Sequence, residues 1–131
     1  MKIYLASRYS RYKEMQAYAV DLERSGHVVT SRWIAGDHQL KDGELSEQAA
    51  EEKRIKFAQE DLQDLLNAEA CISFTEEPRS SNSRGGRHVE FGIALATNKL
   101  VLVVGYRENV FHCLPEVKFF ETWEQARTTF K

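Results

Sequence analysis

The sequence predicts an α/β fold, a single-domain Rossmann-like or flavodoxin-like sandwich with helices on both faces of a mostly parallel five-stranded sheet. Short apolar runs alternate with longer segments of helical period, which is the pattern of parallel strands joined by right-handed helical crossovers. No internal repeat or linker-like segment divides residues 1–131. A hydrophobic content of 42% is ordinary for one globular domain with its own core.

Five short segments are predicted to be strands. Residues 2–6 and 100–104 are apolar over nearly their whole length, as strands buried on both faces of a parallel sheet are. The other strands are expected at residues 27–30, 70–74 and 117–119.

Four segments are predicted to be helices. The first spans residues 11–25 and ends before Gly26, a typical C-terminal glycine. A long helix begins at Ser46 as N-cap and ends near Asn67, and its expected buried stripe is Ile55, Ala58, Leu62, Leu65 and Leu66. The third helix covers residues 87–97. A terminal helix follows Thr122, with Thr122 as its cap and Gln125 at the capping-box position.

Composition and charge argue against several classes of protein. The net charge of -2 does not favour a binder of nucleic-acid polymers, which neutralises phosphates with excess Lys and Arg. No apolar run approaches the roughly 20 residues that span a bilayer, so no membrane association is expected. Cys71 and Cys113 lack metal-type spacing and no leader-like segment precedes the first strand, so we expect a reduced, cytoplasmic protein.

No cofactor or metal is predicted. The four histidines form no His-x-x-x-His pair and have no Cys partners at ligand spacing. The glycine pair Gly85-Gly86 is neither Gly-x-Gly-x-x-Gly nor followed by Gly-Lys-Ser/Thr, so the motif supports neither dinucleotide nor NTPase chemistry.

A Gly-rich turn that leads into an apolar helix occupies residues 84–96. Gly85 and Gly86 allow a tight turn close to a ligand, and the first turn of a helix offers free N–H groups and a positive dipole end. We expect Glu90 in that first turn, held in its ionised form, as a candidate nucleophile or base. A first-turn glutamate also simply complements the helix dipole.

The predicted topology brings three loops to one cleft. In parallel α/β sheets ligands bind beyond the carboxyl ends of the strands, where residues 7–10, 79–90 and 106–112 are expected to converge. Asp61 lies near the C-terminal, electronegative end of its helix, where a carboxylate is locally unfavourable. Such inconsistencies tend to occur at functional sites, although a solvated surface aspartate is the commoner explanation.

Three features together resemble the nucleoside 2-deoxyribosyltransferase family and its 2'-deoxynucleoside 5'-monophosphate N-hydrolase relatives. They are Tyr4 in the first strand, the Asp61-Leu62 pair, and the run from Glu90 to Ala94 before the fourth strand. The resemblance covers essentially the whole chain. It implies that Glu90 attacks the anomeric carbon of a deoxyribonucleoside and that another base or water resolves the covalent deoxyribosyl-enzyme.

The resemblance also implies roles for other residues. Asp61 matches the acid that assists the departing or entering base, and Tyr4 matches a tyrosine near the nucleophile. Asn109 stands where the family donates a polar residue across a subunit interface, so a homodimer or higher homo-oligomer is expected. The implied substrates are a small-molecule nucleoside or nucleotide and a nucleobase.

Arg84 departs from the family pattern. Transferases carry an aspartate six positions before the catalytic glutamate, which holds the sugar 5'-hydroxyl, and nucleotide hydrolases carry a serine that accepts a 5'-phosphate. Arginine donates and does not accept hydrogen bonds, so Arg84 favours a phosphorylated substrate or another anion, with Arg8 and Arg87 as further candidates. Alternatively, Arg84 turns outward or pairs with Glu76 or Glu77.

Other interpretations stay open. Trp33 packs in the core or, with Ile34, walls a nucleobase pocket. The Gly85 to Glu90 segment loosely resembles the Gly-Gly-x-Gly-Thr-x-x-Glu motif of cytokinin-activating phosphoribohydrolases, without its third Gly and its Thr. A non-catalytic nucleotide or ADP-ribose sensor would use the same cleft and arginines without needing Glu90 or Asp61. Transfer to another base is the leading prediction, with hydrolysis of 5'-monophosphates as its alternative.

Overall fold

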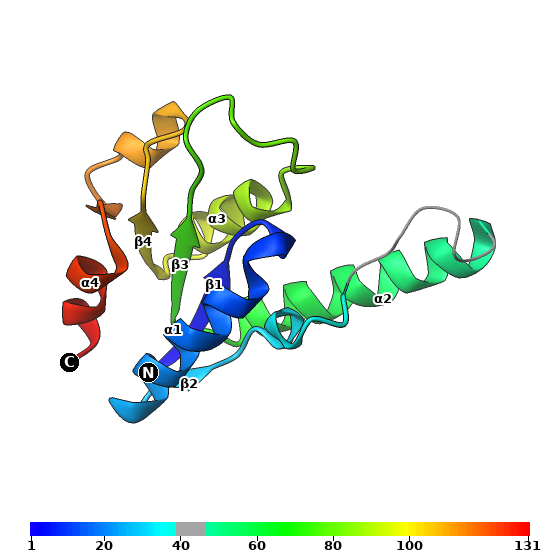
Figure 1. The fold of residues 1–131 in the computed structure, drawn as a ribbon, viewed down its shortest axis with the longest axis horizontal. Helices are drawn as coiled ribbons and strands as arrows, with labels where there is room; N and C mark the ends of the chain where they lie inside the picture. Colours follow the sequence, from blue (N-terminus) through cyan, green and yellow to red (C-terminus); the bar gives the residue numbers. More distant parts are fainter. Residues whose placement is uncertain (39–46) are drawn as a thin grey trace.

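The computed structural model describes residues 1–38 and 47–131, which form a five-stranded, all-parallel sheet of order β2-β1-β3-β4-β5 (Figure 1). The strands are β1 (Lys2–Ala6), β2 (Val28–Val29), β3 (Ala70–Phe74), β4 (Leu100–Val104) and β5 (Lys118–Phe120). The predicted α/β class is confirmed, and β1, β3 and β4 have the predicted bounds. The edge strand β2 is shorter than expected. β5 begins one residue late because the Val117 amide closes a turn onto the Leu114 carbonyl.

The centre of the sheet is the core of the fold. β3 is buried along its whole length, and β1 and β4 are buried at every position except the first. Burial on both faces explains why these strands read as continuous apolar runs rather than as alternating ones. Removing these side chains from water is the main favourable contribution to folding.

Helices cover both faces of the sheet (Figure 1). They are α1 (Tyr12–Arg24), α2 (Glu47–Leu66), α3 (Gly86–Ala96) and α4 (Trp123–Ala126). Tyr18 of α1 stacks on Phe74 and on Trp123 of α4, with ring centroids 5.2 and 4.7 Å apart, so α1 and α4 share one face. α3 lies against the opposite face, where α2 contacts it. Four 3-10 turns complete the described chain: η1 (Tyr9–Arg11), η2 (Arg32–Ala35), η3 (Val110–Cys113) and η4 (Arg127–Phe130).

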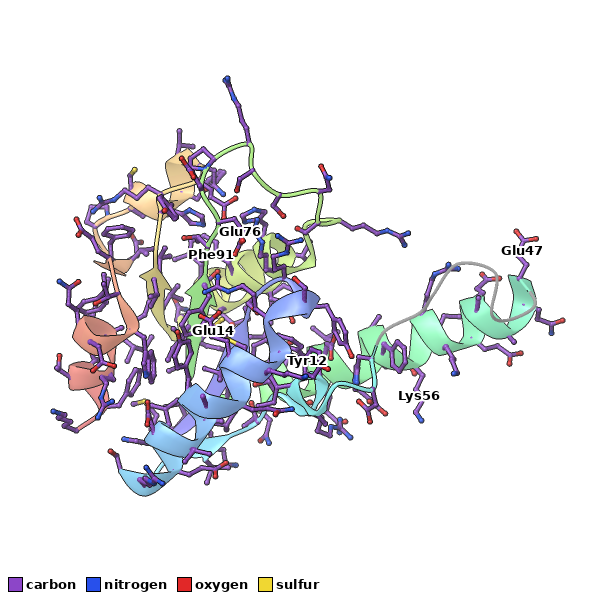
Figure 2. The ribbon with its side chains drawn as sticks, in the orientation of Figure 1. Tyr12, Glu14, Glu47, Lys56, Glu76 and Phe91 are labelled. Carbon is purple, nitrogen blue, oxygen red and sulfur yellow. The ribbon has the colours of Figure 1, made fainter. Side chains whose placement is uncertain are left out.

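The predicted buried stripe of α2 is wrong. Of its five members only Leu65 is buried, whereas Ile55 and Leu62 are 51% and 45% exposed. The helix extends well past the edge of the sheet, so its first half, with Glu47 and Lys56, has no sheet to pack against (Figures 1 and 2). The predicted N-cap Ser46 lies outside the described residues.

The predicted cap of α4 and the predicted C-terminal glycine of α1 are both present. Thr122 caps α4 by accepting a hydrogen bond from the Gln125 amide, as predicted. Gly26 follows α1 with a φ of 89°, the left-handed conformation expected of a C-terminal glycine. Within residues 1–38 and 47–131, no helix combines the length and the apolar character needed to cross a membrane.

Candidate active site

The strand order reverses between β1 and β3, and a cavity of about 470 Å³ opens beside this point, beyond the carboxyl ends of the strands. Its walls come from the segments after β1, β2 and β3, from α2 and from the start of α3. The lining residues are Ser7, Arg8, Tyr9, Ser10, Trp33, His38, Asp61, Asn82, Ser83, Arg84, Gly85, Gly86, Arg87 and Glu90. The volume lies within the range of small-molecule sites.

Glu90 reaches this cavity from the second turn of α3 rather than from the first. The helix begins one residue earlier than predicted, at Gly86, and Gly85 is its N-cap with a φ of 84°. A side chain in the second turn lies farther from the free N–H groups, so dipole complementation does not explain Glu90. Its specific partner is instead Tyr4, a fully buried residue of β1 whose hydroxyl donates a hydrogen bond to Glu90 Oε2.

Burial dominates the acidity of Glu90. Burial and, to a smaller extent, the charge of Asp61 raise the pKa of the carboxyl group, the hydrogen bond from Tyr4 lowers it, and the net result is a pKa of about 8. This shift is opposite to the expectation that Glu90 is held in its ionised form, because desolvation favours the neutral carboxyl group. Burial and the neighbouring Glu90 raise the pKa of Tyr4, so its hydroxyl remains a donor.

Asp61 borders the same cavity from α2. Its side chain is 31% exposed, and burial raises its pKa to about 6, although the nearby His38 lowers it. A carboxyl group with this pKa is protonated in an appreciable fraction of molecules near neutral pH, which suits proton donation. Asp61 and Glu90 are electrostatically coupled, so their titrations belong to the pair.

Trp33 combines two roles that the sequence left as alternatives. It is buried in the core, where its indole Nε1 donates to the Leu5 carbonyl at 2.8 Å, and it also lines the cavity. Tyr9 lies beside it with the ring centroids 6.2 Å apart. Ile34 is partly buried but is not among the lining residues. The rings of Trp33 and Tyr9, tilted by 45° to each other, give the cavity an aromatic wall on one side.

The three candidate arginines differ in their pairing. Arg87 is buried, and its guanidinium binds both carboxylate oxygens of Glu108, one of them at 3.0 Å. Arg8 is 3.6 Å from Glu76, which also binds Arg11. Arg84 is exposed on the cavity wall, and within residues 1–38 and 47–131 no carboxylate lies within ion-pair distance of it. The alternative pairing of Arg84 with Glu76 or Glu77 is therefore absent from the described residues.

The loop after β4 does not join this cavity, contrary to expectation. Asn109 lines a second cavity of about 500 Å³, on the outer side of α3, together with Phe111 and Val89. In its own chain the Asn109 side chain accepts a hydrogen bond from the Phe111 amide, which caps η3. The loop after β2 takes the place that the sequence assigned to the loop after β4.

His38 is the site residue that sequence reasoning missed. It follows β2 by nine positions and has no motif partner nearby in sequence, so only the arrival of α2 beside the loop brings it to Asp61. Among the residues that the structure describes, no three His, Cys, Asp or Glu side chains lie close enough to hold a metal ion.

Comparisons with known proteins support the fold. No protein-family model and no curated protein matches the sequence. Among solved structures, the chain resembles a 2-deoxyribosyltransferase of the psychrotolerant bacterium Bacillus psychrosaccharolyticus, with a TM-score of 0.70 and 21% identity over 96% of this chain and 90% of that one. It also resembles the Clostridium botulinum CMP N-glycosidase BcmB, with a TM-score of 0.56 and 17% identity over 92% and 87% of the two chains.

Both structural relatives are enzymes of N-glycosidic bonds, one a transferase and the other a glycosidase by name. At these identities the likeness establishes a common fold. The chain is therefore an α/β sandwich that shares its fold with these two enzymes and has a cavity at its β1/β3 switch point.

Proposed function

We propose that the protein cleaves the N-glycosidic bond of 2'-deoxyribonucleosides or their 5'-monophosphates and transfers the deoxyribosyl group to another nucleobase. The observation that carries this proposal is the Glu90 carboxyl group, fixed by the Tyr4 hydroxyl at one side of a cavity that Asp61 borders at another. A nucleophilic carboxylate and a second carboxyl acid are the equipment for a double displacement at an anomeric carbon. The names of the two structural relatives, a 2-deoxyribosyltransferase and a CMP N-glycosidase, support a proposal of this chemistry.

In the proposed first step, one Glu90 oxygen bonds to C1' of the sugar as the bond from C1' to the base nitrogen breaks. The electron pair of that bond stays with the base, which takes a proton from Asp61. Tyr4 engages Oε2 and so leaves Oε1 for attack. In the second step an entering base displaces Glu90 and returns its proton to Asp61, so two inversions give overall retention.

Hydrolysis of a 5'-monophosphate to the free base is the second candidate, and Arg84 favours it. Its guanidinium lies at the cavity next to Gly85 and Gly86, whose amides begin α3. A helix N-terminus and an unpaired arginine together suit a phosphate group. The same phosphate site is compatible with transfer, so only the acceptor, a second base or water, distinguishes the two reactions.

The proposed function is tested by chromatography of deoxynucleosides and their 5'-monophosphates incubated with the protein. Release of free base only when a second base is present, with formation of the new nucleoside, indicates transfer. Release without an added base indicates hydrolysis. Tight binding of a nucleotide without release of base from any of them would contradict both reactions and leave the non-catalytic sensor.

Arg84→Ala is expected to impair monophosphates selectively. A charge-assisted contact to phosphate contributes about 1.5–3 kcal/mol, so kcat/KM for 5'-monophosphates should fall about 10- to 100-fold. Nucleosides, which lack the phosphate, should change less than about threefold. Arg79→Ala is the matched control, because Arg79 is exposed on the same loop but does not line the cavity. Equal losses for both substrate classes would exclude Arg84 as the phosphate ligand.

We further propose that the active form is a homodimer or a higher homo-oligomer, in which Asn109 reaches the cavity of a neighbouring subunit. The outer side of α3 and the adjoining η3 turn support this, because they expose Val89, Val110 and Phe111 at 63%, 77% and 59%. Contiguous exposed apolar side chains are typical of subunit contacts.

Phe111→Asp is predicted to dissociate the oligomer, since it places a charge in that contact. Sedimentation velocity should show a dimer or larger species for the wild type and a monomer for Phe111→Asp. Val20→Asp changes an exposed apolar residue of α1, on the other face of the sheet, and should leave the assembly intact. A monomeric wild type at micromolar concentration would contradict the proposed assembly.

A further inference from the structure

His38 is held tightly against α2 although it belongs to the loop after β2. Its side chain is only 6% exposed, and its ring stacks on Phe57 with the centroids 4.5 Å apart. Its backbone also contacts the Tyr9 side chain. These contacts orient the imidazole so that it reaches the cavity wall beside Asp61.

The two ring nitrogens of His38 face different carboxylates. Nδ1 is 2.7 Å from Asp37 Oδ1. The interaction with His38 lowers the pKa of Asp37, so that carboxylate accepts and Nδ1 carries the proton. On the other side, Nε2 is 3.0 Å from Glu60 Oε2 and 3.6 Å from Asp61 Oδ1.

The space between Nε2 and Asp61 requires a proton. A bare Nε2 lone pair facing two ionised carboxylates would be repelled by both, so at least one of the three groups carries a proton. Both Nε2 and Asp61 Oδ1 are buried and make no well-aligned hydrogen bond within the described residues. The nearby cations are engaged elsewhere: Arg32 binds Asp64, and Lys56 lies 3.9 Å from Glu60.

We propose that His38 is a positioning residue for the general acid: its Nε2 carries a proton, lies 3.6 Å from Asp61 Oδ1, and stabilises the carboxylate that Asp61 becomes when it donates its own proton. This inference rests on the proposed function and assigns a role to a residue outside the catalytic set of Glu90, Asp61 and Tyr4. When the bond from C1' to the base nitrogen breaks, the O–H bond of Asp61 breaks and a base N–H bond forms. The Asp61 carboxylate then faces a protonated His38, and the proton that the entering base or water releases returns to Asp61.

The proposal predicts a particular behaviour of His38→Gln. Glutamine can still direct an N–H group toward Asp61, but it carries no positive charge to stabilise the carboxylate. The expected result is a fall in kcat of about tenfold or more, with KM nearly unchanged, because general acid catalysis contributes about 10² to 10⁴ in rate. Both limbs of the pH profile should move to higher pH, since loss of a nearby cation raises the pKa of the coupled carboxyl groups.

A double-mutant cycle with Asp61→Asn separates this role from a structural one. If His38 acts through Asp61, the double variant should be no slower than Asp61→Asn alone, within about twofold, because the two changes remove the same function. Gln16→Ala is the matched control for loop position. Gln16 ties the same loop to α1 by donating to the Ile34 carbonyl at 2.7 Å and does not touch Asp61.

The outcomes distinguish this inference from the proposed function. If the wild type releases no base from any nucleoside or monophosphate, the proposed function fails and the inference fails with it. Suppose instead that the wild type is active. His38 then only anchors its loop if the losses in kcat caused by His38→Gln and Asp61→Asn multiply in the double variant. The same conclusion follows if Gln16→Ala causes the same loss in kcat as His38→Gln and leaves both limbs of the pH profile in place. The function then stands and the role of His38 is overturned.

Discussion

Glu90→Gln should lose at least about 10³-fold in kcat for base release, because removal of a nucleophile cannot be compensated by the rest of a site. Gln keeps the shape of the side chain and still accepts the hydrogen bond from Tyr4, so substrate binding should survive. The measurement is steady-state release of base, accompanied by substrate affinity from isothermal titration. Activity within tenfold of wild type would remove Glu90 as the nucleophile.

The same variant has a predicted effect on stability. In the folded protein the pKa of Glu90 is about 8, above its ordinary value of 4.5, so the native state retains a proton that the unfolded chain releases. Glu90 therefore favours folding at low pH, and this contribution is lost as the pH rises toward 8. Gln does not ionise, so the melting temperature of Glu90→Gln should exceed that of the wild type by a margin that widens from pH 5 to pH 8. A constant margin would mean that folding does not raise the pKa of Glu90.

Asp61→Asn should produce the second largest loss, about 10²- to 10⁴-fold in kcat, which is the usual contribution of a general acid. The loss should depend on the leaving group. 7-Methyl-2'-deoxyguanosine carries a base that is already cationic and departs without protonation, so Asp61→Asn should affect it much less than 2'-deoxyguanosine. Equal losses for both substrates would contradict the role of Asp61 as the acid.

The pH profile gives an independent test of Asp61. The coupled pair titrates near 6 and near 8, so between these values it holds one proton, which lies mostly on Glu90 and in a smaller fraction of molecules on Asp61. That smaller fraction, with Glu90 ionised and Asp61 protonated, is the reactive form. Below about 6 the pair holds two protons and Glu90 is neutral, and above about 8 the pair holds none and no acid remains, so wild-type kcat/KM should be bell-shaped. In Asp61→Asn the alkaline limb should disappear. The remaining limb should reflect Glu90 alone, at a pH below about 8, because the Asp61 charge that raises the pKa of Glu90 is gone.

The central strands could be predicted to the residue because their signal is local. β1, β3 and β4 are apolar at nearly every position, and only burial on both faces of a parallel sheet demands that. The buried stripe of α2 could not be predicted in the same way. Helical period identifies the helix, but whether Ile55 or Leu62 is covered depends on how far the sheet extends beneath it.

In the candidate site too, the residues that could be predicted are those with a local sequence signal. Short sequence motifs identify Tyr4, Asp61 and Glu90 as candidate site residues, and the fold brings all three to one region. Arg87 was expected to hold substrate, yet Glu108, which lies 21 residues away, binds its guanidinium. His38 carries no local signal because its partners Glu60 and Asp61 arrive on another element. Long-range pairing of charges is the information that spacing along the chain does not contain.

The most direct test of a covalent deoxyribosyl-Glu90 intermediate is intact-protein mass spectrometry after rapid acid quenching with substrate. The account predicts a mass increase of one deoxyribosyl group, or of its 5'-phosphate when a monophosphate is the substrate. Peptide mapping should place this group on Glu90, and Glu90→Gln should remain unlabelled. Base release without any adduct under these conditions, or an adduct on another residue that persists in Glu90→Gln, would contradict the account.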